Sequence, residues 1–319
     1  MTSVWTSLSI AFAFASLIIS FSADAIARTL VVNGTHSAAN DAHPGTESQP
    51  LKTINRAAQL AQPGDTVVVY AGVYRERVSP ARGGKQGRPI TYKTVEGAEV
   101  IIRGSEVWKP EWKRLHNTKP IYRGELDPEL FSGERINPYR TRLKRAPFGQ
   151  QLTLGQIFVD GHRLREVDGV DTLMETAATW RVDGDSIAVH FPHDERALAD
   201  RLVELTVRDR IFAPHRRGLG HIHVKGLTME HCANQFPDRF WESDSPQAGA
   251  LSCRSGHHWL IEANTIRFAK SIGIDCGYEG QHDLEGNQPT PQNTGQHVIR
   301  GNIITDHGCC GIAGMRSLQ

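Results

Sequence analysis

One acidic residue interrupts a repeated apolar pattern in the last third of the chain. Three short stretches align there, at residues 250–253, 273–276 and 311–314. Successive side chains of a β-strand point to opposite faces, so the alternation that turns Leu251 and Ile274 inward turns Asp275 outward. Asp275 is the only acid in the three stretches. We therefore interpret it either as a solvated surface carboxylate or as one acid of a sugar-cleaving site.

Cleavage of a glycosidic bond generally uses two carboxylates, so Asp275 needs a partner. The carboxyl groups lie ~5–5.5 Å apart in retaining enzymes and ~6.5–9.5 Å apart in inverting ones, and stacked strands are spaced by about 4.8 Å. The equivalent positions in the neighbouring stretches hold no acid. We predict Asp275, Glu279 and Glu230 as catalytic residues. The other sources of a partner are Asp283, Asp306 and any further repeat.

The segments around Asp275 carry side chains that suit a sugar site. Aromatic rings offer flat apolar faces, and imidazole and carboxylate groups offer hydrogen bonds. The substrate-binding residues that we predict are Trp241, His257, His258, Tyr278, His282 and Asp283. His257 and His258 begin a repeat, so a structural corner is the alternative for that pair.

The sequence contains no recognisable metal motif. HExxH, paired CxxC, an EF-hand loop and a Gly-rich phosphate loop are all missing. We predict no metal site and no cofactor, although a polysaccharide lyase on this chain would use Ca²⁺. The five cysteines have no zinc-site spacing, and we expect most of them to be small core residues. They are Cys232, Cys253, Cys276, Cys309 and Cys310.

The elements that position these residues repeat along residues 211–319. The stretches 224–229, 261–266 and 299–304 align with offsets of 37 and 38 residues, and each follows a histidine. A fixed period of this kind is typical of stacked supersecondary units. Asn264 and Asn302 occupy equivalent places, where an amide ladder would support a tight corner. These repeats predict a solenoid, with further coils missing after Gln319.

The preceding regions have other patterns. Residues 28–105 read as short strands around a helix at 53–61, which would form a cap and the first coils. Residues 106–210 contain strand pairs separated by Asp-Gly turns at 160–161 and 183–184, typical of β-hairpins. We expect this region to form a small inserted β subdomain.

The N-terminus and the charge balance indicate where the protein works. Residues 8–21 are apolar and small residues follow, so we interpret 1–27 as a signal peptide, with an uncleaved anchor as the alternative. Lys and Arg number 36 and Asp and Glu 35, a balance that disfavours binding to nucleic acid through a basic surface. We expect a secreted, periplasmic or extracellular monomer without further membrane attachment, acting on a polysaccharide or oligosaccharide.

Two parts of the chain resemble known families. PGT at 44–46, LKTI at 51–54, PGDTV at 63–67 and GVYRE at 72–76 resemble the N-terminal coils of secreted right-handed parallel β-helix proteins. That group includes pectate-lyase-like polysaccharide lyases and some glycoside hydrolases. Residues 210–264, with QIFVDG at 156–161, resemble glycoside hydrolase family 141. The resemblance implies activity on fucosidic or xylan linkages.

Together these observations predict an all-β fold. We expect a right-handed parallel β-helix with a short N-terminal capping helix and an inserted β subdomain. The function expected first is a glycoside hydrolase acting through paired carboxylates. A lyase is the second hypothesis, with Lys270, Arg267 or Arg254 as base or cation. A non-catalytic glycan-binding β-helix is the third.

Overall fold

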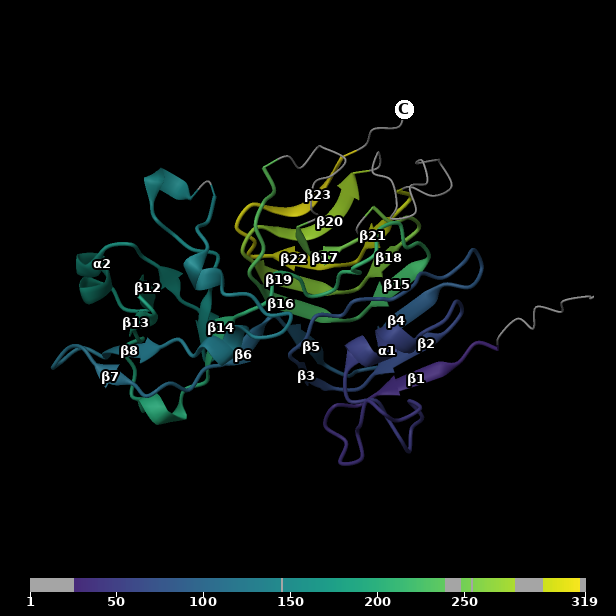
Figure 1. Ribbon diagram of the computed structural model, residues 1–319, viewed down its shortest axis with the longest axis horizontal. Helices are drawn as coiled ribbons and strands as arrows, with labels where there is room; N and C mark the ends of the chain where they lie inside the picture. Colours follow the sequence, from purple (N-terminus) through teal and green to yellow (C-terminus); the bar gives the residue numbers. More distant parts are fainter. Residues whose placement is uncertain (1–25, 145, 239–247, 254, 279–294, 316–319) are drawn as a thin grey trace, which may run out of the picture.

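The computed structural model describes residues 26–144, 146–238, 248–253, 255–278 and 295–315. In these residues the chain is mostly β-structure (Figure 1). The α-helices there are α1 (Ile54–Leu60) and α2 (Val170–Glu175). Short 3-10 helices cover Pro128–Phe131, Pro138–Arg140, Pro147–Gly149 and Leu198–Asp200. None of the described helices has the length and apolarity needed to cross a membrane.

Three sheets, called A, B and C below, are built from parallel strand pairs. Sheet A contains β1 (Thr29–Val32), β2 (Thr66–Val69), β4 (Ile90–Thr94), β15 (Ile222–Lys225), β18 (Leu260–Glu262) and β21 (Val298–Arg300). Sheet B contains β3 (Gly72–Tyr74), β5 (Val100–Arg103), β16 (Thr228–Cys232), β19 (Thr265–Ala269) and β22 (Ile303–Thr305). Sheet C contains β17 (Gly249–Ser252), β20 (Ile272–Tyr278) and β23 (Cys310–Met315).

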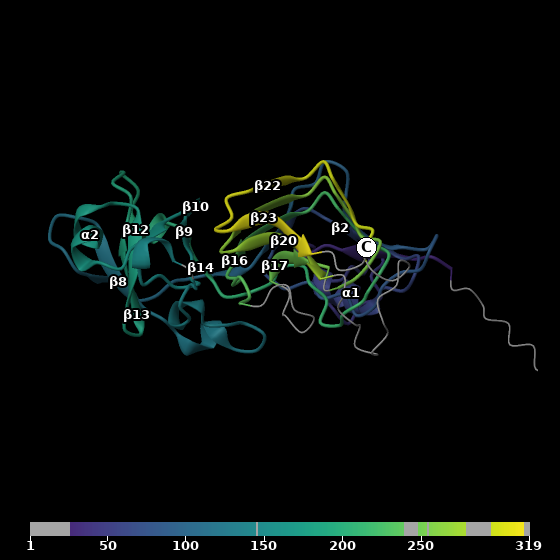
Figure 2. The same ribbon diagram turned by 90° about the horizontal axis from the view of Figure 1, so that it is seen from above.

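From β15 onward the chain passes through the three sheets in the order A, B, C and then returns to A, so that each pass forms one coil (Figures 1 and 2). The earlier passes, with β2 and β3 and with β4 and β5, contain strands of sheets A and B. Val224 pairs with Ile261, and Ile261 pairs with Ile299. On sheet C, Ser252 pairs with Asp275. The two registers on sheet A confirm the predicted stacking at offsets of 37 and 38 residues, and the sheet C register confirms the predicted alignment of 250–253 with 273–276.

Residues in the left-handed backbone conformation form the corners of the coils. Where the chain enters sheet A, φ is 53° at His221, 52° at His258 and 56° at Gln296. The same conformation recurs at two further corners, at Gly226, Ala263 and Gly301 and at His231, Phe268 and Asp306. A non-glycine residue adopts it at a cost of roughly 1–2 kcal/mol, which the parallel ladders must offset. Equivalent corner side chains of successive coils therefore lie close to one another.

Two asparagines connect successive coils next to one of these corners. The Asn264 side chain accepts a hydrogen bond from the Leu227 amide at 3.0 Å and donates to the Val224 carbonyl at 2.9 Å. The Asn302 side chain accepts from the Asn264 amide at 2.9 Å and donates to the Ile261 carbonyl at 2.8 Å. The predicted asparagine ladder is confirmed.

We expect Asn264→Ala to lower the free energy of unfolding by about 2–4 kcal/mol. Asn264 is buried, so its loss leaves the Leu227 amide and the Val224 carbonyl unpaired away from water, and each orphaned group costs ~1–3 kcal/mol. Urea titration of both proteins measures the difference. Asn302→Ala serves as the control and should cost less, because Asn302 is only partly buried. Equal losses of unfolding free energy in the two variants would show that the burial of Asn264 is not the cause of the effect.

All three sheets contribute to one apolar core. Its buried members include Leu30, Val67 and Val224 of sheet A, Ile102, Met229 and Ile266 of sheet B, and Leu251 and Ile274 of sheet C. Phe212 lies between two other rings, with centroids 5.1 Å from Tyr92 and 6.2 Å from Trp259. Helix α1 adds Ile54, Ala57 and Ala58 to this core and packs beside β1 and β2, as a cap on the first coil.

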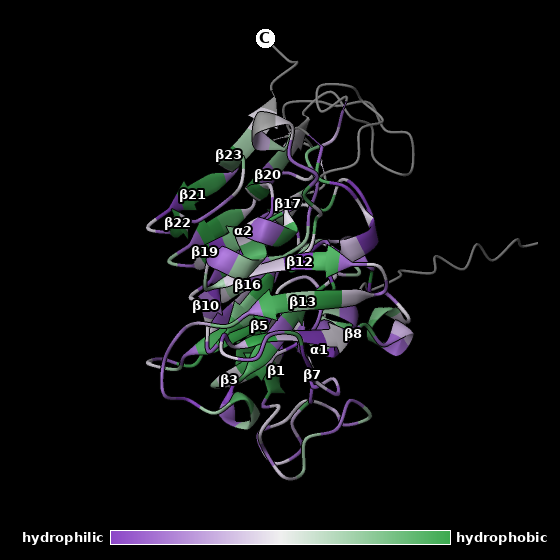
Figure 3. Cartoon of the chain, turned by 90° about the vertical axis from the view of Figure 1, so that its left-hand side faces the viewer, coloured by the Kyte–Doolittle hydropathy of each residue, from purple (hydrophilic) through white to green (hydrophobic). Residues whose placement is uncertain are grey.

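The inserted subdomain lies to one side of the stacked sheets (Figures 1 and 2). Its first sheet contains β6 (Ser105–Val107), β9 (Ile157–Val159), β10 (His162–Arg163) and β14 (Val203–Thr206). Its second contains β7 (Lys113–Arg114), β8 (Ile121–Glu125), β11 (Arg165–Glu166), β12 (Thr179–Asp183) and β13 (Ser186–His190). Figure 3 views the molecule from this side, with β13 coloured mainly as hydrophobic. The subdomain has its own core around Trp108, Tyr139 and Trp180.

The five cysteines are all free. Cys232 and Cys253 belong to the core of the stacked sheets, as predicted. Cys276 and Cys310 are half-buried, whereas Cys309 is exposed. The prediction of a core position is wrong for Cys309, because it stands at the corner before β23, where the next strand begins.

Candidate functional site

A network of buried charges joins the inserted subdomain to sheet B. Glu230 of β16 lies in register between Arg103 of β5 and Arg267 of β19. Arg103 Nε donates to Glu230 Oε1 at 2.5 Å, and Arg267 Nε donates to Oε2 at 2.7 Å. Glu204 of β14 is also paired with Arg103, at 3.1 Å, and with Arg75, at 2.6 Å.

The contacts of Glu230 favour a structural role over the predicted catalytic one. Its side chain is 1% exposed, and each carboxylate oxygen is held by a guanidinium group. A buried charge is tolerated when it is paired and fully hydrogen-bonded in this way. The catalytic role of Glu230 stays a prediction. Its observed partners belong to the network that joins sheet B to the inserted subdomain.

Asp275 points away from the core, as the alternation predicts, but it does not face an open groove. Its relative exposure is 0%. The carboxylate accepts hydrogen bonds from the Ala248 amide at 2.6 Å and from the Gly277 amide at 2.7 Å. Burial raises the pKa of Asp275, and these amide hydrogen bonds oppose the shift. The expected solvent-facing position is wrong because the backbone at Ala248 and Gly277 packs against the carboxylate and binds it.

The other predicted residues fall into three groups. Glu279, Trp241, His282 and Asp283 lie outside the described residues. Tyr278 ends strand β20. His257 and His258 lie together at the entrance to sheet A, with the two Nδ1 atoms 2.9 Å apart. Asp275 and Glu230 lie in different sheets and have no hydrogen-bonding partner in common among the described residues.

A cavity of about 840 Å³ opens where the inserted subdomain meets the corner between sheets B and C. The subdomain lines it with residues that include Gln150, Gln156, Arg163, Glu166 and Trp180. The stacked sheets contribute Gln235, Phe236, Lys270, Ser271 and Cys309. The volume lies within the range of ~300–1,000 Å³ that is usual for small-molecule sites.

A buried ion pair stands in the wall of this cavity. Lys270 Nζ lies 3.1 Å from Glu166 Oε2 and donates to the Gly155 carbonyl at 3.0 Å. Glu166 Oε1 accepts from the amide and the hydroxyl of Thr153, both at 2.8 Å. Burial raises the pKa of Glu166 and lowers the pKa of Lys270, while each partner opposes the shift of the other. Perturbed titratable groups in a pocket are typical of functional sites.

Two buried polar atoms of the cavity-lining residues lack a hydrogen bond within the described part of the chain. They are Nε1 of Trp180 and Oγ of Ser271, whose residues are 1% and 2% exposed. Buried polar groups are nearly always paired in native proteins. Both atoms have almost no accessible surface, so they lie behind the lining of the cavity rather than on its open face.

The charged lining residues are mostly basic. Lys144, Arg163, Arg165 and Lys270 line the cavity together with the acid Glu166. Lys144 is paired with Asp238, and Arg163 donates to the Asp306 carbonyl at 3.0 Å. The lining therefore favours ligands that are neutral or negatively charged.

Sequence reasoning did not single out Glu166 or Trp180. Glu166 follows a short hairpin and Trp180 lies in another one, and nothing in their spacing relates them to Lys270, 104 residues after Glu166. For Lys270 the sequence predicts only a role as base or cation of a lyase. A signal was present in QIFVDG at 156–161, because this stretch begins with a residue that lines the cavity.

Comparison with known proteins relates this architecture to carbohydrate-active proteins. A solved structure of XylC in complex with xylose superposes with a TM-score of 0.74 at 27% identity, over 90% of this chain and 51% of XylC. A structure described as a glycoside hydrolase superposes with a TM-score of 0.60 at 13% identity, over 90% of this chain and 67% of that one. At this low identity the likeness supports a shared fold and nothing about activity. This chain thus spans about half the length of XylC.

Two sequence matches each cover a minor part of the chain. Residues 37–80 match the family described as protein of unknown function, DUF1565. The uncharacterized protein YwoF of Bacillus subtilis strain 168 is 31% identical over 86 residues, which are 26% of this chain and 18% of YwoF. The family match lies in the first coils, and neither match carries a statement about activity.

Proposed function

We propose that this chain forms the sugar-binding part of a secreted right-handed parallel β-helix protein of the glycoside hydrolase type. The cavity beside Glu166 and Lys270 is its binding site, and the ligand is a neutral glycan that contains xylose. The observation that carries the proposal is this cavity, with the buried ion pair of Glu166 and Lys270 in its wall. The likeness to XylC, a protein that binds xylose, supports the choice of sugar. The signal-peptide pattern of residues 1–27 supports export.

The lining offers both kinds of contact that a sugar ring needs. Phe236, which is half-buried, supplies flat apolar surface for the C–H face of a pyranose ring. Gln150, Gln156 and Gln235 supply amide donors and acceptors for hydroxyl groups. A mostly apolar pocket with a few polar groups is the usual form of a small-molecule site.

Glu166 has the environment of a proton donor. A carboxyl group whose pKa is raised by burial keeps its proton closer to neutral pH, which suits protonation of a leaving oxygen. Hydrolysis needs a second carboxylate, ~5–5.5 Å away for retention or ~6.5–9.5 Å away for inversion. Asp275 and Glu279 remain the predicted sources of this second group.

Titration calorimetry with xylose and xylobiose tests the binding site. We expect both sugars to bind and Glu166→Gln to weaken binding roughly 10–100-fold, because a hydrogen bond to a charged group contributes ~1.5–3 kcal/mol. Glu262→Gln is the matched control, since Glu262 forms ion pairs on sheet A, away from the cavity-lining residues. Unchanged affinity in Glu166→Gln would refute the cavity as the site.

A lyase acting on uronate-containing glycans is the second candidate, and the basic lining of the cavity favours it. Arg163 and Arg165 would face a uronate carboxylate, and Lys270, with its lowered pKa, would serve as the base that takes the C5 proton. Incubation with polygalacturonate and glucuronoxylan distinguishes the two. A lyase produces unsaturated ends that absorb in the ultraviolet and loses activity with a chelator if it uses Ca²⁺, whereas a hydrolase produces reducing sugar without that absorbance.

A further inference from the structure

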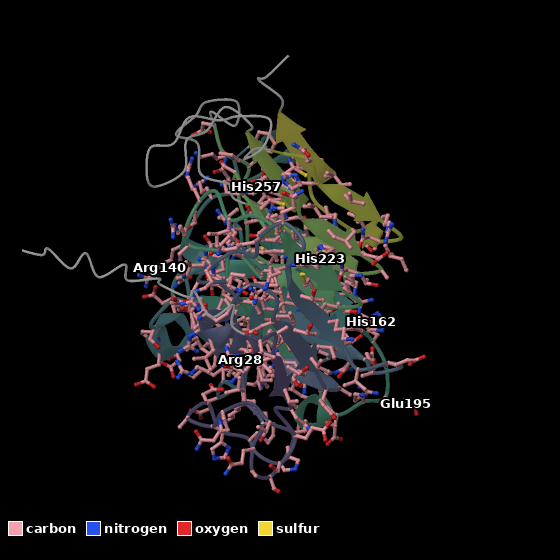
Figure 4. The ribbon with its side chains drawn as sticks, turned by 90° about the vertical axis from the view of Figure 1, so that its right-hand side faces the viewer. Arg28, Arg140, His162, Glu195, His223 and His257 are labelled. Atoms are coloured by element: carbon pink, nitrogen blue, oxygen red, sulfur yellow. The ribbon has the colours of Figure 1, made fainter. Side chains whose placement is uncertain are left out.

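The stacking of coils brings three histidines together at the corner where the chain enters sheet A. His221 precedes β15, and His257 and His258 precede β18 in the next coil. His221 and His258 occupy equivalent left-handed corner positions, so their rings stack with centroids 4.7 Å apart. Figure 4 labels His257 in a view from the side opposite the inserted subdomain. None of these three histidines is among the residues that line the proposed sugar cavity, so the cluster is separate from it.

The nitrogen atoms of the three rings converge. One ring nitrogen of each histidine lies within 4.8 Å of the others. The Nδ1 atoms of His257 and His258 are 2.9 Å apart, and the His257 ring stands almost perpendicular to the other two, at 89° to each. In a tetrahedral zinc site with Zn–N bonds of ~2.0–2.1 Å, the ligand nitrogens are about 3.3 Å apart. Small rotations of the rings would reach this spacing.

The backbone makes room for the convergence. Gly220 pairs with His257 across the coils, and a Cβ atom at residue 220 would lie 2.1–2.5 Å from atoms of the His257 ring. Only glycine at this position lets the imidazole lie over the preceding coil. The orientation of the His257 ring thus depends on the glycine at position 220. This supports a cluster with a defined geometry rather than three independent surface histidines.

The chemistry of the cluster suits a transition metal. Neutral imidazole nitrogens prefer Zn²⁺, Cu²⁺ and Ni²⁺, whereas Ca²⁺ and Mg²⁺ prefer oxygen ligands. His297, on the following coil, adds a buried Nε2 atom that lacks a hydrogen-bonding partner within the described residues.

We propose that His221, His257 and His258 bind one divalent transition-metal ion, with Zn²⁺ as the expected occupant, and that the ion clamps two successive coils together. Three protein ligands leave one position of a tetrahedral site for water. Sequence analysis predicted no metal site because the ligands do not share a local motif. The coil period places residues 221 and 258 next to one another although 37 positions separate them.

Equilibrium dialysis of the full chain against Zn²⁺, without a polyhistidine tag, followed by metal analysis, tests the proposal. We expect one ion per chain, a higher Tm with Zn²⁺ than with a chelator, and the intense visible absorption of four-coordinate cobalt when Co²⁺ replaces Zn²⁺. Failure to retain one equivalent of Zn²⁺ would overturn the proposal.

The variants should keep the fold intact. His221→Asn and His258→Asn preserve the corners, because asparagine tolerates the left-handed conformation. Each should weaken Zn²⁺ binding at least about 10–100-fold, since even the loss of an outer-shell partner has an effect of that size. His162→Ala, on exposed strand β10, is the control and should bind normally. Equal Zn²⁺ affinity in the two asparagine variants and the parent would refute the assigned ligands.

Discussion

Glu230→Ala is expected to lower the free energy of unfolding by about 3–5 kcal/mol, the usual effect of removing one partner from a buried ion pair. The substitution leaves Arg103 and Arg267 on the two strands that flank β16, without the carboxylate that binds both guanidinium groups. It also weakens the junction with the inserted subdomain, because Arg103 is shared with Glu204. Urea titration followed by tryptophan fluorescence measures the change.

Sheet A provides a matched control for this experiment. Glu262 lies in register between Lys225 and Arg300, and its carboxylate is paired with both, at 2.9 and 2.6 Å. This ladder is more exposed, and pairs in contact with water contribute little. We expect Glu262→Ala to have a much smaller effect than Glu230→Ala. Equal effects would show that burial of the sheet B network contributes nothing to stability.

Lys270→Met is expected to destabilise the protein by about 3–5 kcal/mol at neutral pH, because it leaves the buried Glu166 carboxylate without its cation. The double variant Glu166→Gln/Lys270→Met should recover part of this loss, since it removes the uncompensated charge. Lys113→Met is the control, because the Lys113–Glu125 pair is exposed on both sides. A loss in Lys270→Met no larger than that in Lys113→Met would contradict the inferred burial of the pair.

The pH dependence of Lys270→Met follows from the pKa of Glu166. Burial already raises this pKa, and removal of the ammonium group raises it further. The folded state of the variant then binds a proton more tightly than the unfolded chain does. Its stability therefore increases as the pH falls through the folded pKa toward the ordinary glutamate value, and the penalty is complete above the folded pKa. Unfolding experiments at about pH 5 and about pH 8 measure the expected difference.

Local patterns in the sequence were sufficient for the elements and for their register. The apolar alternation and the fixed period specify which residues face the core, so Val224, Ile261 and Ile299 could be aligned correctly in advance. The Asp-Gly turn after Val182 predicted the hairpin of β12 and β13, in which Asp183 pairs with Ser186. These features depend on neighbours along one strand or one turn, and such interactions are encoded locally.

The candidate site was less predictable, because burial depends on distant segments. Asp275 was placed on the correct face of its strand, but its cover, which includes the Ala248 amide, could not be inferred from strand alternation. Glu230 was recognised as an acid on a coil, but its role depends on Arg103, 127 residues earlier. No local sequence motif identifies a carboxylate that accepts hydrogen bonds from residues of several coils.

The sequence alone determined the strands, the corner asparagines and the vertical pairing of repeats, because short-range periodicity and turn chemistry control them. Only the tertiary structure decided which polar groups share an environment. Folding brings Glu166 to Lys270 and His221 to His258, and it buries Asp275. These contacts arise from the docking of the inserted subdomain and from the stacking of coils. The free energy of a charge or of a ligand atom depends on its neighbours in space rather than on its neighbours along the chain.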